Sequence, residues 1–296
     1  MLDSMPLARY AAEHWIDHAK SGGMDPSVLP LILHFFTSES APFKNWIRIH
    51  DIDIQLTFWD LIPSMKLERK NFGSPLYYSS LTGMQEVSDC LLKVENANAK
   101  GGLIGSPLQA ASHEGHEAIV RLLLENGAEV NAQEGDFGNA LYAASYRGNE
   151  AIVKLLLENG AEVNAEGGEY GNALQAASYE GNEAIVKLLL ENGAEVNAEG
   201  GRFGNALQAA SYKGSEAIVK LLLENGAEVN AEGGEYGNAL QAASASYRDI
   251  EAIVKLLLEN GAEVNAEGGQ FGNALQAASY KGSEAIVNCC LRMGQR

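Results

Sequence analysis

The segment His-Trp-Ile-Asp-His contains two residues of a type that binds metals. His14 and His18 lie four positions apart, so on a helix both side chains would share one face, as zinc ligands do. However, Asp17 stands where the H-x-x-E-H zinc motif has its Glu, and no third ligand suggests itself. We therefore interpret both histidines as helix-surface or helix-packing residues.

The three cysteines are the other candidates for chemistry. Cys289 and Cys290 are adjacent and stand where other copies of a repeated phrase have Leu-Leu, and Cys90 falls on a similar Leu position. We interpret all three as small buried apolar residues, which fits a reducing environment better than a disulfide framework does. No Ser/His/Asp or Cys/His constellation is placed for catalysis. The sequence therefore predicts a protein that is not an enzyme, with no catalytic residue, no metal site and no cofactor.

Much of the chain consists of copies of one phrase at a nearly fixed spacing. The phrase Gly-Asn-Ala-Leu-Gln-Ala-Ala-Ser, or a close variant of it, recurs in steps of 33, 33, 33, 33 and 35 residues and starts at Gly105, Gly138, Gly171, Gly204, Gly237 and Gly272. A fixed period in this range indicates one supersecondary unit stacked many times, with each copy burying its apolar face against its neighbours.

Residues 138–170 illustrate the secondary structure that the sequence of one copy predicts. Asn139 is suited to cap a short helix over 140–147, and Gly148 to end that helix in the left-handed conformation. Asn149, replaced by Ser in later copies, is expected to cap a second helix that starts at Glu150. The stretch after this helix lacks helical periodicity and contains a Gly-Gly pair. The unit is therefore helix, tight turn, helix and extended loop.

This pattern resembles the ankyrin repeat. The stretch GNALQAASYRGNEAIVKLLLENGAEVNA follows the family pattern G-x-TPLHxAAxxGHxxIVxLLLxxGAdvNa nearly position by position. The resemblance implies an all-α solenoid of stacked helix-turn-helix units with loop or β-finger connections. Some residues depart from the family pattern: Gln175 replaces a His that ties neighbouring repeats together, and Gly-Gly replaces an Asp of the loop. We therefore expect short or altered β-fingers.

The array is expected to occupy residues 71–296, with a degenerate first unit near Gly73, and residues 1–70 to form an N-terminal helical cap. Helices are expected over 6–20, 28–36 and 42–49. The loop phrase NAEGGEYGNALQAASY and the opening PLARYAAEHWIDHA also resemble fungal proteins that join a NACHT nucleotide-switch domain to ankyrin repeats. This second resemblance implies the recognition end of a fungal signalling protein, since no G-x-x-x-x-G-K-[ST] phosphate loop is present.

Charge narrows the range of partners. The net charge is −18, and residues 101–296 alone carry 12 Lys and Arg against 27 Asp and Glu. Such a surface repels phosphate backbones and anionic lipid, so we expect neither nucleic acid nor membrane as a partner. No secretory signal or membrane span is evident. We expect a cytoplasmic protein, with the nucleus as an alternative, that is monomeric unless it joins a larger signalling assembly.

Candidate binding residues emerge from a comparison of the copies, because the apolar positions hardly change whereas two polar positions do. In ankyrin proteins these two positions face the groove where protein partners bind, and Tyr suits such a surface. The alternative for each Tyr is packing on the next repeat. The first set, ahead of the turn glycine, is Tyr146-Arg147, Tyr179-Glu180, Tyr212-Lys213, Tyr247-Arg248 and Tyr280-Lys281. The second set, at the loop tips, is Asp136, Glu169, Arg202, Glu235 and Gln270, each followed by an aromatic residue that we expect to pack between repeats.

One copy breaks the period. Residues 244–250 contain two extra residues, and Asp249 replaces the turn glycine. An L-residue cannot adopt the left-handed turn as readily as glycine does. The sequence therefore predicts a local bulge and a less stable joint in the stack.

Overall fold

The computed structural model describes residues 16, 27–37, 73–99, 101–246 and 250–293. It divides the chain into two compact units, Met1–Glu129 and Val130–Arg296. Most of the expected cap, including His14, His18 and the helices expected over 6–20 and 42–49, lies outside the described residues. The boundary expected at residue 70 therefore stays a prediction.

The first unit contains the cap helix that is described and two repeats. Helix α2 (Leu29–Thr37) matches the helix expected over 28–36 and contacts α6. The helices of the two repeats are α5 (Pro75–Leu81), α6 (Gln85–Leu91), α7 (Pro107–Glu114) and α8 (Glu117–Glu125). Cys90, on α6, is half-exposed, so the expectation that it is buried is wrong: its position lies toward the solvent side of this short helix.

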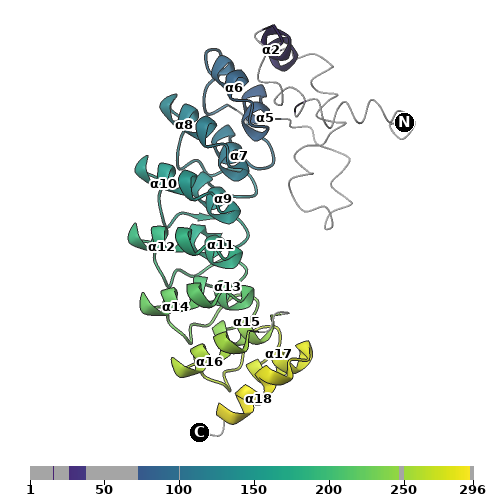
Figure 1. Cartoon of the computed structure of the whole chain (residues 1–296), viewed down its shortest axis with the longest axis vertical. Helices are drawn as coiled ribbons and strands as arrows, with labels where there is room; N and C mark the ends of the chain where they lie inside the picture. The colour runs from purple at the N-terminus through teal and green to yellow at the C-terminus, as the bar shows by residue number, and fades with distance from the viewer. Residues whose placement is uncertain (1–15, 17–26, 38–72, 100, 247–249, 294–296) are drawn as a thin grey trace, which may run out of the picture. The chain divides into compact units, whose positions relative to one another are not determined.

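The second unit contains five repeats, each with a first and a second helix, and Figure 1 shows them as two adjacent rows. The first helices are α9 (Ala140–Arg147), α11 (Ala173–Glu180), α13 (Ala206–Lys213), α15 (Ala239–Ser244) and α17 (Ala274–Lys281). The second helices are α10 (Glu150–Glu158), α12 (Glu183–Glu191), α14 (Glu216–Glu224), α16 (Glu251–Glu259) and α18 (Glu284–Met293). First helices pack most extensively on one another, and this row forms the core.

The ends of the first helices follow the expected chemistry. The side chain of Asn139 accepts a hydrogen bond from the backbone N–H of Tyr142 at 2.8 Å, which satisfies a donor that the helix leaves free. Gly148 ends the helix with φ of 78°. Both predictions are therefore confirmed.

The expected cap of the second helix is wrong. The side chains of Asn149 and Ser215 make no capping hydrogen bond. A two-residue turn holds Asn149 at ψ of 73°, whereas Asn139, which does cap, has ψ of 167°. Because the turn prevents the extended backbone that a cap requires, the side chain does not bond to the first turn of its helix. The equivalent Asn182 donates to the carbonyl of Ser145 in the preceding repeat at 3.1 Å.

A glutamine ties each of the first helices α11, α13 and α15 to the next repeat. The side-chain amide of Gln208 donates to the carbonyls of Ala231 at 3.0 Å and Gly237 at 2.9 Å, and Gln175 and Gln241 make equivalent bonds. Its side-chain oxygen accepts from the N–H of Asn205 at 2.9 Å and completes a capping box. Gln therefore makes the link between repeats that the family pattern assigns to His.

A second tie runs between the loops. The side chain of Asn164 donates to the carbonyl of Gly193 at 3.2 Å and accepts from the N–H of Glu195 at 2.9 Å. Asn131, Asn197 and Asn230 make the same pair of bonds to the repeats that follow them. Each Asn thus satisfies one donor and one acceptor of the next repeat.

The β-fingers are short, as the Gly-Gly pair predicts. Strands β1 (Glu166–Gly167) and β2 (Gly171–Asn172) pair antiparallel, and the three later loops have single bridges such as Gly233↔Gly237. The second Gly of the three later pairs lies against the preceding loop: a Cβ on Gly234 (φ +61°) would lie 2.2 Å from the carbonyl carbon of Phe203. Neighbouring loops therefore approach to a distance that only glycine permits.

The irregular copy has a shortened first helix. Helix α15 ends at Ser244 after six residues, and its cap Ala245 has right-handed φ and ψ in place of the left-handed glycine of the other first helices. Residues 247–249, which include the candidates Tyr247 and Arg248, lie outside the described residues. The weaker joint stays a prediction.

We expect Gly234→Ala to lower the free energy of unfolding more than Gly226→Ala does. Both glycines have positive φ, but a Cβ on Gly226 (φ +87°) meets no atom within 4 Å, so it adds only the conformational cost of about 1 kcal/mol. Urea unfolding of the two variants measures the difference, which isolates the contact between loops. Equal losses in both variants would show that this contact is relaxed in solution.

Candidate partner-binding surface

The tyrosines of the first set lie at the same place on successive first helices. Tyr146, Tyr179 and Tyr212 occupy the last-but-one position of α9, α11 and α13, and each is half-buried. Tyr280 on α17 is 73% exposed. The repeat period therefore brings these side chains to one edge of the row of first helices, as the sequence predicts.

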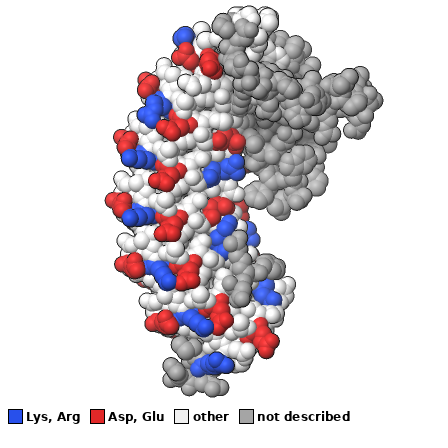
Figure 2. Space-filling view, viewed as in Figure 1, with Lys and Arg blue, Asp and Glu red and all other residues white. Residues whose placement is uncertain are grey.

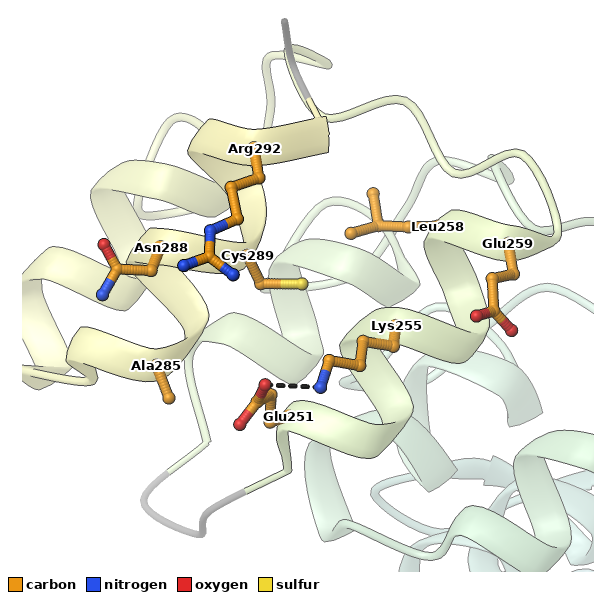
Figure 3. Close-up of a pocket in the computed structure, with 8 residues that line it drawn as sticks. All are labelled: Glu251, Lys255, Leu258, Glu259, Ala285, Asn288, Cys289 and Arg292. Atoms are coloured by element: carbon orange, nitrogen blue, oxygen red, sulfur yellow. Dashed lines mark ion pairs between the residues drawn. The ribbon is translucent and has the colours of Figure 1, made fainter. Parts of the chain in front are cut away.

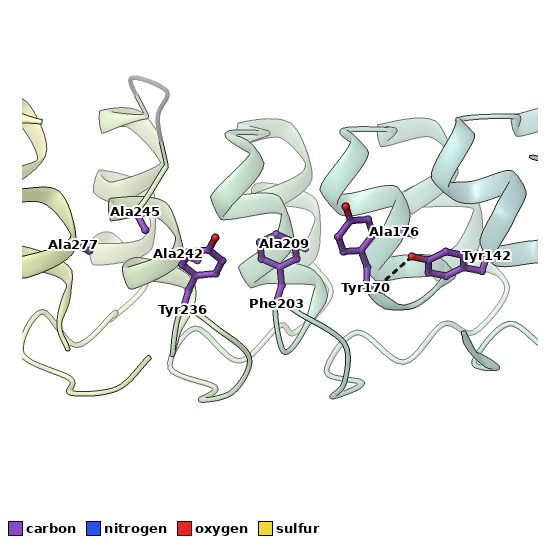
Figure 4. Close-up of a cluster of buried hydrophobic side chains, with 9 residues drawn as sticks. All are labelled: Tyr142, Tyr170, Ala176, Phe203, Ala209, Tyr236, Ala242, Ala245 and Ala277. Atoms are coloured by element: carbon purple, nitrogen blue, oxygen red, sulfur yellow. Dashed lines mark hydrogen bonds between the residues drawn. The ribbon is translucent and has the colours of Figure 1, made fainter. Parts of the chain in front are cut away.

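The loop-tip aromatics lie between them. Tyr170, Phe203 and Tyr236 are buried under the first helices, and Figure 4 shows them in a row with Tyr142 beside the small residues Ala176, Ala209 and Ala242. Packing of these aromatics between repeats, the expected arrangement, is confirmed.

Together these rings form one stack, which we call the aromatic row. Its members are Phe137, Tyr142, Tyr146, Tyr170, Tyr179, Phe203, Tyr212, Tyr236, Phe271 and Tyr280. Helix and loop rings alternate: Tyr179 lies 4.4 Å from Tyr170 and 5.0 Å from Phe203 between ring centroids, and Tyr212 lies 5.1 Å from Phe203 and 4.7 Å from Tyr236. Pairs at these separations attract one another beyond the area that they bury. Each helix tyrosine therefore packs on the row and still presents an edge at the surface.

Burial sets the ionisation of these phenols. The pKa of Tyr146 is raised to about 12, first by burial and then by the charge of Glu180. Burial also raises the pKa of Tyr142, whose hydroxyl accepts the backbone N–H of Tyr170 at 3.1 Å. These two phenols are therefore uncharged at neutral pH.

Several charged candidate residues of the first set form ion pairs or ring contacts with other residues of the chain. The ammonium of Lys213 lies 3.5 Å from a carboxylate oxygen of Glu180 and 4.9 Å above the ring of Tyr179. The ammonium of Lys281 lies 5.5 Å from the ring centre of Phe271. Arg147 is exposed. The ion pair between Glu180 and Lys213 thus links two neighbouring repeats beside the tyrosines.

The loop tips of successive repeats are also bonded to one another. Arg202 bridges two neighbours, with Nε 2.7 Å from a carboxylate oxygen of Glu235 and Nη1 3.2 Å from one of Glu169. The hydrogen bond to Glu235 raises the pKa of Arg202, so the bridge remains charged. Gln270 donates to Glu235 at 2.9 Å, and backbone bonds join the same tips. The exposed Asp136 continues this line at the first loop.

The sequence reasoning missed this pairing of the loop tips. It treated Glu169, Arg202 and Glu235 as separate contacts for a partner. The signal was present, because opposite charges recur exactly one repeat apart and stacking brings equivalent positions side by side.

The second helices present a different surface. Figure 2 shows acidic and basic side chains in bands along them, and pairs such as Lys255–Glu251 at 2.6 Å and Lys220–Glu216 at 2.5 Å account for part of this pattern. Exposed pairs of this kind contribute little to stability. None of the candidate binding residues lies on the second helices.

The described residues offer no support for catalysis. They contain no group of three or more His, Cys, Asp or Glu that could hold a metal ion. Cys289 and Cys290 are buried, as expected, and burial raises the pKa of both thiols, that of Cys290 to about 11. A protonated thiol is a poor nucleophile at neutral pH. No described helix has both the length and the apolar composition needed to cross a bilayer.

These features define a repeat protein of stacked helix-turn-helix units, and sequence comparison identifies the family. The profile "Ankyrin repeats (3 copies)" matches residues 133–200 and 206–294, and "Ankyrin repeats (many copies)" matches 108–157. The first profile covers more than half of the chain, so the chain belongs to the ankyrin-repeat family and the expected fold class is confirmed.

The chain is also similar to two individual proteins. Azaphilone pigments biosynthesis cluster protein L of Monascus ruber is 39% identical over 142 residues, which are 44% of this chain and 29% of that protein. The chain thus matches less than a third of the length of this curated relative. The crystal structure of the human ASB11 ankyrin repeat domain matches with a TM-score of 0.65 and 28% identity, over 74% of this chain and 97% of the domain.

We expect stability to fall at alkaline pH in a way that Tyr146→Phe reduces. Folding raises the pKa of Tyr146 from about 10 to about 12, so its neutral form stabilises the fold fully below pH 10, and this contribution is lost as the pH rises toward 12. Urea unfolding at a series of pH values, with wild type and variant compared, isolates this group from the other alkaline titrations. Identical pH profiles for the two proteins would contradict the shift.

Proposed function

We propose that the chain is a non-enzymatic scaffold that binds a protein partner along the line where first-helix ends and loop tips meet. Ankyrin repeats are in general protein–protein interaction modules without catalytic activity. One observation carries the proposal for this chain: Tyr146, Tyr179 and Tyr212 keep exposed edges although both neighbours in the aromatic row hold their rings in place. A ring already immobilised loses little entropy on binding, so it suits a contact surface.

The charged residues complete this proposed surface. Arg147 offers a cation at one end, and Tyr280 and Lys281 on α17 lie toward the other. Tyr247 and Arg248 are included in the proposed surface from their place in the repeated sequence alone. At the loop tips, Asp136, Glu169, Arg202, Glu235 and Gln270 present polar groups whose mutual bonds fix their positions. Both signs of charge are present, which favours a protein partner of mixed charge, and the net charge of −18 disfavours nucleic acid.

We expect Arg147→Glu to weaken capture of the partner, while Lys154→Glu leaves it unchanged. The two variants make the same charge change within one repeat, but Arg147 ends a first helix and Lys154 lies exposed on a second helix. The immobilised full chain is incubated with a lysate of Monascus ruber, the organism of the curated relative, and retained proteins are quantified by mass spectrometry. A rim charge of this kind changes affinity by about tenfold or less.

Two outcomes of the lysate experiment would contradict the proposed surface. A protein retained equally by wild type and by both variants would remove the proposed surface, and retention sensitive only to Lys154→Glu would move the site to the second helices. Circular dichroism of each variant controls for folding.

A second proposal concerns the larger protein to which such a module belongs. We infer that the chain corresponds to the recognition part of a fungal protein of the NACHT–ankyrin type, with the nucleotide switch absent from this chain. Support comes from its similarity to less than a third of a longer fungal protein, together with the loop phrase NAEGGEYGNALQAASY.

This second proposal predicts a phosphate-binding loop encoded in frame with the chain. Sequencing the full-length transcript tests it, and G-x-x-x-x-G-K-[ST] ahead of residue 1 is the expected result. A full-length transcript without this motif would reject the assignment while leaving the scaffold proposal intact.

A further inference from the structure

A cleft of about 440 Å³ lies between the second helices α16 and α18, on the side of the repeats away from the aromatic row. Figure 3 shows the side chains that line it: Glu251, Lys255, Leu258, Glu259, Ala285, Asn288, Cys289 and Arg292. Its volume falls within the range of small-molecule sites, which combine apolar walls with a few polar groups.

The cleft coincides with the places where the last repeat departs from the others. Second helices α10, α12, α14 and α16 all read Glu-Ala-Ile-Val-Lys-Leu-Leu-Leu-Glu, whereas α18 reads Glu-Ala-Ile-Val-Asn-Cys-Cys-Leu-Arg. Asn288 replaces Lys, Cys289 replaces Leu and Arg292 replaces Glu, and all three line the cleft. The first two changes shorten side chains and so open space, and the third reverses a charge.

Two acids, Glu251 and Glu259, and two cations, Lys255 and Arg292, line the cleft, so a site for an anion can only be local to Arg292. Lys255 is paired with Glu251 at 2.6 Å, and no carboxylate of the described residues lies within ion-pair distance of Arg292. The pKa of Lys255 is raised, first by its hydrogen bond to Glu251, and the charge of Arg292 is the smallest influence on it. A carboxylate that binds beside Arg292 would therefore meet a guanidinium that no acid of the described residues already pairs with.

The polar and apolar groups of the cleft are arranged so that it could bind a ligand with a negative group at one end and an apolar remainder. Arg292 and Asn288 lie four residues apart on α18 and therefore share a helix face. A guanidinium and a side-chain amide together suit a planar carboxylate. Leu258, Ala285 and the buried Cys289 supply apolar wall for the remainder of a ligand.

A counterpart cleft, formed by second helices of the first unit, lacks this arrangement of charges. It lies between α6 and α8 and is lined by Gln85, Glu117, Ala118, Arg121, Leu122 and Glu125. Its single cation, Arg121, is paired with Glu117 at 3.0 Å, and Glu125 adds a second acid. This cleft keeps the Glu at the position that Arg292 occupies in α18, and it offers no unpaired cation to an anion.

We propose that the cleft between α16 and α18 binds the carboxylate of a small organic acid with an apolar chain, through Arg292 and Asn288. The site is separate from the partner-binding surface and does not depend on it. Its chemistry is that of the last repeat alone, because α10, α12, α14 and α16 place Lys and Glu where this site has Asn288 and Arg292, and α8 places Arg and Glu there.

Binding of hexanoate to the full chain tests the proposal, with hexanamide as the uncharged control. We expect saturable binding of hexanoate with a dissociation constant on the order of 1 mM, detected as amide chemical-shift changes at Leu258 and Ala285. Hexanamide should bind at least about tenfold more weakly, because it lacks the charge that Arg292 pairs with.

Two variants locate the site. The triple variant Asn288→Lys, Cys289→Leu and Arg292→Glu restores, at these three positions, the residues of α10, α12, α14 and α16. It should weaken hexanoate binding at least about tenfold without lowering the melting temperature. Arg121→Glu makes the same charge reversal in the counterpart cleft and should leave binding unchanged.

Three results would overturn the proposal. These are no saturable binding of hexanoate, equal binding of hexanoate and hexanamide, or full binding by the triple variant. The lysate experiment with Arg147→Glu gives an independent outcome, since Arg147 lies on a first helix and touches no part of this cleft.

Discussion

Burial of the internal first helices, each between two neighbours, is the constraint on which the rest of the structure depends. Leu207 and Ala210 of α13 are at most 1% exposed, and no single repeat could bury them alone. Such contact also buries polar groups, which must then find partners. Gln208 meets this requirement by closing its own helix cap and donating to two carbonyls of the next repeat. Glycines such as Gly234 let the loops come close enough for these bonds to form.

The aromatic row follows from the same stacking. A loop ring such as Phe203 is enclosed because a helix ring lies on each side of it, and each helix ring is held in turn by two loop rings. The tyrosines on the first helices therefore combine a structural role with an exposed edge. The two alternatives that the sequence left open, packing or partner contact, are compatible in the geometry of Tyr179 and Tyr212. A rigid edge of this kind suits recognition of a folded partner better than a flexible loop would.

How much the sequence could predict depended on how local each interaction was. Asn139 and Gly148 behave as expected because a cap and a left-handed turn depend on a few adjacent residues. Asn149 fails as a cap because its backbone is set by the short turn, which residue preference does not reveal. Arg202 was predicted as a candidate contact for a partner, and its ion pairs with Glu169 and Glu235 were missed, since those carboxylates come from the repeats before and after it. The cleft between α16 and α18 was missed altogether, although Asn288, Cys289 and Arg292 were visible as departures from the repeat.

The sequence by itself determined the family, the helix-turn-helix unit, the short β-fingers and the positions that vary between copies, because a 33-residue period and its capping residues are encoded locally and many times over. Only the tertiary structure decided which of the variable side chains bond to one another, which aromatics are enclosed, and where an unpaired cation borders a cleft. The physical reason is that these properties depend on distances between residues about 33 positions apart. Such distances exist only once the repeats are stacked.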